Sequence, residues 1–208
     1  MVKVLGPAFS MDASGSLAGA LVFSKWKGRN YIRQLVTPAN PKSGGQVGMR
    51  AAFKFLTQQW ASLSAPNQAT WEDRADDMVA SAFNAYLSYN QKRWRNFKGM
   101  SKDDPAIDTA DGSTLGVLSV VASERSITVT QAVTTAGNAW GICIFRSPTT
   151  TFDTAWNNLI AIEPVDGTED VVHVDSPLDP GDYYYDTRPL IDDGLLGAET
   201  GEETDTVV

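Results

Sequence analysis

The hydrophobic pattern of the first hundred residues begins with strand-like alternation and continues with helical spacing. Residues 17–25 and 31–36 read as two β-strands, and the segment between them contains Gly28 and Asn30, which tolerate the positive φ of a tight turn. This pattern predicts a β-hairpin. Neither face of the hairpin is cleanly polar, and an isolated hairpin is marginally stable in water, so we expect a helix or a neighbouring subunit to cover it.

Three amphipathic helices are expected after the hairpin. Ser43 and Gln46 match the capping box S-x-x-Q at a helix start, Ser64 followed by Pro66 marks a second start, and a third helix is expected from about residue 81 to 97. The expected apolar stripes are Phe53, Leu56, Trp60 and Leu63, then Trp71, Ala75 and Met78, then Phe83, Leu87, Asn90, Trp94 and Phe97.

The second half of the chain contains short β-forming runs, separated by segments rich in Gly, Pro, Asp, Asn and Thr. This spacing is typical of an all-β sandwich. The turn Asp179-Pro180-Gly181 followed by Tyr183, Tyr184 and Tyr185 looks like the penultimate strand of a fibronectin type III-like or immunoglobulin-like (Ig-like) domain, where a tyrosine forms the tyrosine corner. The expected strands are residues 115–121, 126–132, 140–146, 159–164, 171–174 and 182–187.

These elements predict an α+β protein with two domains. An arm at residues 1–16 precedes an anchoring domain of hairpin and helices at 17–100. A polar, turn-rich linker at 101–113 leads to a β-sandwich at 114–197, and the acidic tail at 198–208 is expected to be disordered.

Charge is divided unequally along the chain, whose net charge is −8. Residues 1–102 contain 14 Lys and Arg against 5 Asp and Glu, a charge of +9, whereas residues 103–208 contain 3 against 20, a charge of −17. Such asymmetry indicates different surroundings for the two halves, although a random imbalance on two solvated surfaces would give the same numbers.

Residues that usually carry chemistry are scarce. Cys143 and His173 are the only cysteine and histidine, which excludes an intrachain disulfide and a cysteine- or histidine-rich metal site. No P-loop, dinucleotide-binding or nucleophile-elbow motif is present, and Ser43-Gly44-Gly45 reads as a capping turn. We therefore expect no enzyme activity, no catalytic residue, no cofactor and no metal.

Acidic residues are frequent in the predicted loops, but they lack the spacing of an EF-hand. We interpret them as solvated side chains. They are Asp103, Asp104, Asp166, Glu169, Asp170, Asp192 and Asp193. No apolar run approaches the roughly 20 residues of a membrane helix, so no membrane contact is expected.

The hairpin tip is the best candidate for a binding site, because cations and aromatic rings gather there. An acidic protein partner could dock on it, with the aromatic and arginine side chains as anchors. Nucleic acid is a second possibility, and a solvated tip with no partner is a third. The candidate partner-binding residues are Lys25, Trp26, Lys27, Arg29, Tyr31 and Arg33.

A series of motifs runs from the hairpin into the helices: GRNYIR at 28–33, PANP at 38–41 and FNAYL at 83–87, with Gln46, Arg50, Phe53, Trp60, Leu63, Trp71 and Asn90. In this order they resemble a family of small structural proteins of tailed phages and prophages. Members often have a hairpin-plus-helices module, sometimes with an appended Ig-like module. The resemblance covers about residues 13–97.

The resemblance implies a non-enzymatic virion component, made in the host cytoplasm and placed as a capsid decoration, neck or tail accessory subunit. Its partners would be other virion proteins and copies of itself. One alternative is a DNA-binding or packaging accessory protein that uses the same basic residues, disfavoured by the acidic second half. Another is a surface- or carbohydrate-binding module that uses exposed residues of the segment 183–185.

Overall fold

The computed structural model describes residues 2–3, 15–17, 19–36, 39–40, 42–107, 109–194 and 196–208. The chain divides into two compact units, Met1–Pro41 and Lys42–Val208. Helices and antiparallel sheets are both present, which confirms the predicted α+β class. Most of the predicted arm lies outside the described residues, but Val2–Lys3 and Gly15–Leu17 form strands β1 and β2.

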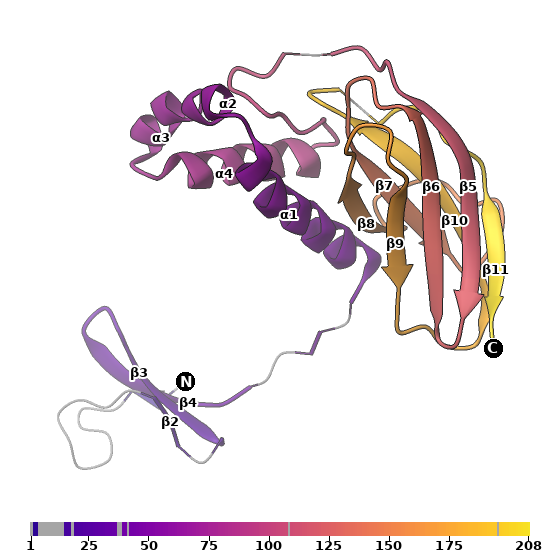
Figure 1. Ribbon diagram of the computed structural model, residues 1–208. Coiled ribbons are helices and arrows are strands. Elements are labelled where there is room, and N and C mark those ends of the chain that lie inside the picture. Colours follow the sequence, from indigo (N-terminus) through magenta and orange to yellow (C-terminus); the bar gives the residue numbers. More distant parts are fainter. Residues whose placement is uncertain are drawn as a thin grey trace. The chain divides into compact units, whose positions relative to one another are not determined.

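The N-terminal unit is a four-stranded antiparallel sheet with the strand order β1-β4-β3-β2. Its two central strands, β3 (Leu21–Trp26) and β4 (Arg29–Gln34), form the predicted hairpin (Figure 1). The hairpin therefore gains a short strand at each edge.

The second unit contains two antiparallel sheets that pack face to face. One has the order β11-β10-β7-β8 and the other β5-β6-β9. Ile127 and Val129 of the three-stranded sheet meet Ile142 and Ile144 of the other in a shared apolar core, as their alternation predicted. The strands are β5 (Thr114–Ser123), β6 (Ser126–Thr135), β7 (Ala139–Ser147), β8 (Leu159–Pro164), β9 (Val171–Asp175), β10 (Gly181–Ile191) and β11 (Glu203–Val207).

The described helices are α1 (Gly44–Ser62), α2 (Ala65–Ala69), α3 (Glu72–Met78) and α4 (Ala82–Arg95). Ser64 caps α2 as predicted, since its hydroxyl accepts the Asn67 N–H at 3.4 Å. Ser43 is the N-cap of α1, but its side chain makes no capping hydrogen bond, so the predicted capping box does not form. None of the described helices is long and apolar enough to cross a membrane.

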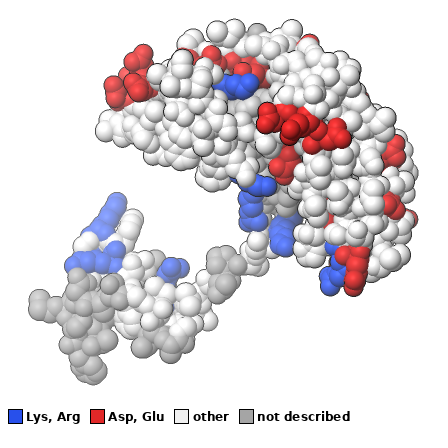
Figure 2. Space-filling view, viewed as in Figure 1, with Lys and Arg blue, Asp and Glu red and all other residues white. Residues whose placement is uncertain are grey.

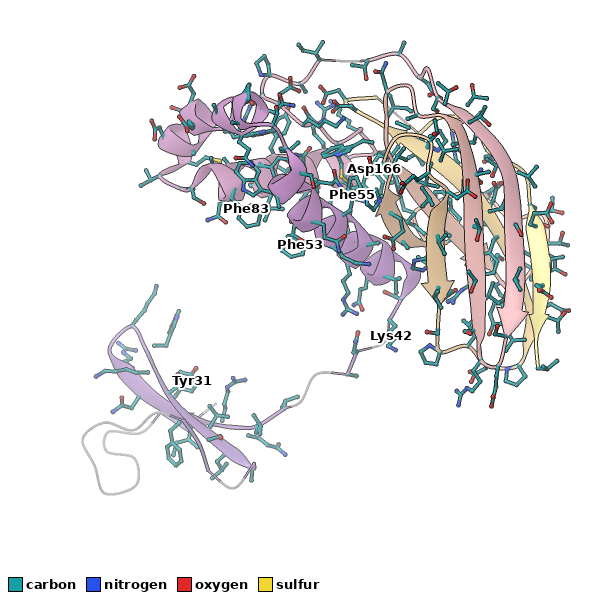
Figure 3. The ribbon with its side chains drawn as sticks, viewed as in Figure 1. Tyr31, Lys42, Phe53, Phe55, Phe83 and Asp166 are labelled. Atoms are coloured by element: carbon teal, nitrogen blue, oxygen red, sulfur yellow. The ribbon has the colours of Figure 1, made fainter. Side chains whose placement is uncertain are left out.

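Helix α1 uses two packing faces, of which the periodicity predicted one. Leu56, on the predicted stripe, is fully buried, whereas Phe53 of that stripe is 46% exposed. The second face contains Gly48 and Phe55, of which Phe55 is labelled in Figure 3, and packs against the sheet. There the Phe55 ring meets Trp140 edge-on at 5.1 Å between centroids. A Cβ at Gly48 would lie 2.9 Å from a backbone oxygen, so only glycine permits this close approach.

Strand β7 is buried on both faces. Ile142 and Ile144 face the three-stranded sheet, whereas Cys143 and Phe145 face the helices. Trp140, expected in the row with the two isoleucines, belongs to the helix side. The sheet that contains β7 is therefore the middle of three layers, between the helices and the second sheet (Figure 1).

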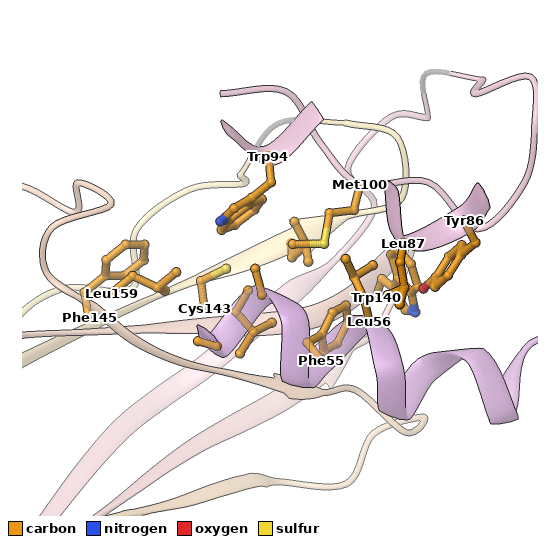
Figure 4. Packing of buried hydrophobic residues seen from close by; sticks show 14 of the residues in the cluster. Phe55, Leu56, Tyr86, Leu87, Trp94, Met100, Trp140, Cys143, Phe145 and Leu159 are labelled. Carbon is orange, nitrogen blue, oxygen red and sulfur yellow. The ribbon is translucent and has the colours of Figure 1, made fainter. Parts of the chain in front are cut away.

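The predicted domain boundary at 101–113 was wrong. One apolar cluster joins helical residues such as Leu56 and Tyr86 to Phe145 and Leu159 of the sheet (Figure 4). The division of the chain falls after Pro41 instead. The reason is that the outer face of the sheet is as apolar as its inner face, so the helices and sheets share a core.

Residues 99–107, which we call the strap, are hydrogen-bonded to the helices. Asn90 of α4 is fully buried. Its amide donates to the Ser101 carbonyl at 3.0 Å, and its side-chain oxygen accepts the Ser101 N–H at 2.6 Å. Asn90 thus satisfies both backbone groups of a buried residue in the strap.

Two further contacts hold the strap. The Trp71 indole N–H donates to the Lys102 carbonyl at 3.0 Å. The Arg74 guanidinium binds both carboxylate oxygens of Asp104, at 2.7 and 2.8 Å. The polar strap, which resembled a linker in the sequence, is therefore held against the helices by these hydrogen bonds.

The acidic tail was predicted to be disordered, and this was wrong for its last residues. Strand β11 pairs with β10, with Val207 opposite Gly181, and Val207 is 1% exposed. The Asp205 carboxylate accepts the Ala122 N–H at 2.7 Å. An open edge of β10 offers unpaired backbone groups, and pairing with them outweighs the acidic composition.

The tyrosines of β10 have different surroundings. The Tyr183 hydroxyl donates to the Asp179 carbonyl at 3.0 Å, which is the contact expected of a tyrosine corner. Tyr185 was expected to be exposed but is fully buried, and its hydroxyl donates to Asp175 at 2.9 Å. A ligand surface that uses Tyr185 is therefore excluded.

Replacing Asn90 with Ala should lower the free energy of unfolding by about 2–4 kcal/mol, because each buried group left without a partner costs about 1–3 kcal/mol. Urea denaturation followed by near-ultraviolet circular dichroism measures this. The control, Asn84→Ala, changes an exposed residue of the same helix and should cost about 0.5 kcal/mol or less. Equal losses in the two variants would contradict the role of Asn90.

His173 and Glu163 link the edge strands of the two sheets, β9 and β8. His173 Nδ1 lies 2.9 Å from Glu163 Oε1, and the Lys54 ammonium approaches the same oxygen at 3.5 Å. The hydrogen bond with His173 lowers the pKa of Glu163, against the opposing effect of burial. His173 is therefore paired with Glu163 and joins the edges of the two sheets.

The pKa of Glu163 is lower in the folded state than its unfolded value of about 4.3, so ionised Glu163 stabilises the folded state above that pH. This stabilisation is lost as the pH falls through the folded-state pKa. Glu163→Gln should be less stable than wild type at pH 6, with a difference that shrinks toward pH 3. Urea midpoints across this range measure it. Glu169→Gln, at an exposed position, should follow the wild-type profile; a pH-independent loss for Glu163→Gln would rule out the ionic contribution.

Candidate functional site

The hairpin register brings four of the six predicted binding residues onto one face. Trp26 lies opposite Arg29, and Val22 lies opposite Arg33. Directly opposed residues of antiparallel strands share a face, and residues alternate along each strand, so Tyr31 joins them between the two arginines. We call Trp26, Arg29, Tyr31 and Arg33 the cationic face.

The other two predicted residues lie elsewhere. Lys25 pairs with Asn30 on the reverse face, so it is separated from the cationic face. Lys27 occupies the turn, where Lys27 and Gly28 have φ of 49° and 76°. Two positive φ values match a two-residue hairpin turn. Lys27 therefore has the positive φ for which the sequence suggested Asn30.

The cationic face is open to solvent. Trp26 is 65% exposed, and the Lys27 ammonium lies over its ring, 4.8 Å from the centroid. Arg29 and Arg33 are exposed and Tyr31 is half-buried. Residues 1–41 contain five Lys and Arg but a single acidic residue, and Figure 2 shows basic side chains on this hairpin. Tryptophan and arginine side chains are enriched among the residues that contribute most of the binding energy in protein interfaces.

The reverse side of the hairpin has an apolar centre. Phe23 lies opposite Ile32, and Leu21 follows on the same face of β3. We call these three residues the apolar face. Leu21 is 38% exposed, the other two are half-buried, and no described side chain of this unit is buried. A small sheet normally needs one covered face to be stable, so the apolar face requires a cover.

Three carboxylates meet where the strap reaches the end of β10. Oxygens of Asp103, Asp192 and Asp193 lie within 4.8 Å of one another. Burial raises the pKa of Asp192, and the carboxylate of Asp103 adds to the rise; burial also raises the pKa of Asp193. These acids were predicted to be separately solvated, and the structure brings them together. No local signal links them, because they come from distant parts of the chain.

The other predicted loop acids behave differently. Asp104 is paired with Arg74, so it is not a solvated side chain. Asp166, Glu169 and Asp170 are exposed, as predicted.

A pocket of about 550 Å³ opens beside the C-terminal end of α4. Trp94 and Trp156 line it with their rings 3.9 Å apart between centroids, and Phe97, which is 65% exposed, lies at its side. Arg188 also lines it, but its guanidinium donates to the Gly197 carbonyl at 2.8 Å. The Arg188 guanidinium is thus engaged within the protein.

Cys143 offers no surface chemistry. The thiol is fully buried between the middle sheet and the helices, and burial raises its pKa. Cys143 therefore cannot act as an accessible nucleophile in the folded protein.

Comparisons with known proteins add little. No protein-family model matches the chain, and no curated protein matches it. Among solved structures, the PKD domain of an M14-like peptidase from Thermoplasmatales archaeon SCGC AB-540-F20 is similar over 47% of this chain and 98% of that domain, with 16% identity and a TM-score of 0.31. A TM-score this low supports no conclusion about fold or function.

Gly28→Ala should destabilise the hairpin, because a Cβ at φ of 76° costs about 1–2 kcal/mol. Nothing lies within 4 Å of the added atom, so the effect is conformational. Amide hydrogen exchange in β3 and β4 should accelerate about fivefold or more. Gly28→Asn is the control and should cost less, because Asn tolerates this conformation; equal acceleration by both variants would argue against it.

Proposed function

We propose that this chain is a non-enzymatic structural subunit of a tailed-phage virion, as a capsid decoration, neck or tail accessory subunit. The N-terminal unit anchors it to the particle. The observation that carries this proposal is the small N-terminal sheet, which has a cationic face on one side and an apolar face on the other. The resemblance of residues 13–97 to structural proteins of tailed phages supplies the class of particle.

The apolar face supports a role in assembly. Burying a large apolar side chain contributes about 1.5–3 kcal/mol relative to leaving it in water. Leu21, Phe23 and Ile32 are only partly covered within their own unit, so a neighbouring subunit that covers them stabilises the sheet and the interface together. Attachment and final ordering of the sheet are then coupled.

The cationic face supports an acidic protein as the partner. Arg29 and Arg33 can each bind a carboxylate through two parallel N–H groups, and Trp26 supplies a large apolar area beside them. Such contacts set orientation and the association rate more than final affinity. A carboxylate-rich surface of a virion protein meets these requirements.

The second unit also fits a surface-displayed module. Its strand order and the Tyr183–Asp179 contact support the fibronectin type III-like or Ig-like sandwich expected from the sequence. Helix α3 presents exposed acids toward solvent (Figure 2); they are Glu72, Asp73, Asp76 and Asp77. In a repeated lattice they can attract the basic N-terminal unit of a neighbouring copy, which is a route to self-association.

DNA binding is the second candidate, because the same face would place cations on phosphates and rings on bases. The charge of −17 on residues 103–208 opposes it. The two candidates differ in their partner, so one experiment separates them.

Purified protein should co-sediment at fixed stoichiometry with empty capsids or tails of the phage that encodes it. The double variant Arg29→Glu and Arg33→Glu should reduce binding at least about tenfold, because each arginine–carboxylate pair is worth about 1.5–3 kcal/mol. The matched control, Lys92→Glu with Arg95→Glu, makes the same charge change at exposed positions of α4 and should bind normally.

Circular dichroism should show that both double variants keep the wild-type fold. Normal co-sedimentation of the Arg29 and Arg33 variant would overturn the anchoring role. Failure of the wild type to bind any particle, with a salt-sensitive shift of duplex or single-stranded DNA, would favour the second candidate.

A further inference from the structure

We propose that Asp103, Asp192 and Asp193 form a binding site for a divalent cation with a preference for oxygen ligands, namely Ca²⁺. This inference is independent of the proposed function. It rests on the position of the three carboxylates and on one buried oxygen of Asp193 that accepts no hydrogen bond within the described residues.

The three carboxylates are close enough together to bind one ion. Oxygens of the three side chains lie within 4.8 Å of one another, and two ligands on one Ca²⁺ are at most about 5 Å apart, because each Ca²⁺–O distance is 2.3–2.6 Å. Asp193 is 3% exposed, whereas the other two are partly accessible. The site thus has a buried floor and an open side where water can complete the coordination.

One carboxylate oxygen of the cluster is buried and has no hydrogen-bond donor among the described residues. Asp193 Oδ2 accepts the Ile107 N–H, but the buried Oδ1 accepts no hydrogen bond of good geometry within the described residues. The Ser101 hydroxyl lies close enough to lower the pKa of Asp193, but it donates its single proton to the Asp103 carbonyl. Its nearest cation is the Arg93 guanidinium, 3.9 Å away and beyond hydrogen-bond distance. A buried carboxylate oxygen without a donor is costly, and a metal ion is one of the partners that relieve this cost.

Among the described residues, the cluster has more acidic than basic side chains. Lys102 approaches Asp192 at 3.5 Å, so two cations face three carboxylates in a partly desolvated site. The remaining negative charge is not balanced by either cation. A bound Ca²⁺ would remove the repulsion among the acids.

The position of the site gives the ion a structural effect. Asp192 accepts the Lys102 N–H at 3.1 Å, and Asp193 donates its N–H to the Met100 carbonyl at 2.7 Å. The ion would therefore join the strap, and with it the helical layer, to the end of β10. Binding should stabilise the folded state by mass action.

Terbium(III), which replaces Ca²⁺ and is excited by nearby indoles, tests the proposal on the full chain. Trp71 donates to the Lys102 carbonyl at 3.0 Å, and the Lys102 ammonium lies 5.5 Å from the Trp140 ring centroid, so two indoles lie beside the site. Titration should give saturable one-to-one luminescence that Ca²⁺ competes away. Asp103→Asn should weaken binding about tenfold or more, since loss of a partner outside the first shell already costs that much.

Asp103→Asn keeps the contacts of this residue with Ser101, which run through its backbone. In the presence of a chelator, the melting temperature of Asp103→Asn should therefore equal or exceed that of the wild type. In millimolar Ca²⁺ the wild type should have the higher melting temperature. Asp170→Asn, at an exposed loop position, is the control and should bind as wild type. Non-saturable luminescence, equal effects of the two variants, or lower stability of Asp103→Asn in both conditions would overturn the proposal.

Discussion

The close approach of α1 to the middle sheet is the constraint on which the second unit depends. Gly48 lets the helix backbone approach the sheet, and Phe55 fills the space beside Trp140. Because this contact closes the outer face of β7 and β8, the sheet is buried on both sides. The strap and α4 then pack around the same cluster, so the helices and sheets form one compact unit rather than an anchor and an appended module.

The described part of the N-terminal sheet, unlike the second unit, is not organised around a buried core. It has no buried described side chain, and its two faces differ in chemistry. Its turn at Lys27 and Gly28 fixes the register, and the register alone decides that Trp26 stands with Arg29 and that Lys25 does not. A one-residue shift of β4 against β3 would move the side chains of one strand to the other face relative to its partner, and Trp26 would no longer share a face with Arg29. The binding character of the hairpin is therefore a property of its turn.

Local signals in the sequence were sufficient for the hairpin, the start of α2 and the alternating strands of the sandwich. Ser64 and the alternation at Ile127 and Val129 act over a few residues, so they are readable without knowledge of distant partners. The small-residue face of α1 was missed because Gly48 adds nothing to a hydrophobic stripe. The turn was predicted over residues 26–30 but consists of Lys27 and Gly28, because Lys27 adopts a positive φ although Asn30 is the residue type that tolerates it better.

Features that depend on distant partners could not be read from the sequence. The strap looks like a linker until Asn90 is placed beside Ser101. Strand β11 is acidic in composition and forms because β10 has an open edge. Asp103 and the pair Asp192 and Asp193 are far apart in sequence, and only the docking of the strap brings their carboxylates together.

The burial of Cys143 has a practical consequence. It is the only cysteine of the chain, and its thiol is fully enclosed between the sheet and α1. Thiol-reactive probes will therefore leave the native protein unmodified, and Ser24→Cys, on the same side of the hairpin as Tyr31, supplies a single labelling position. A spin label or fluorophore attached there reports on shielding of the hairpin in any assembly, with no background from the rest of the molecule.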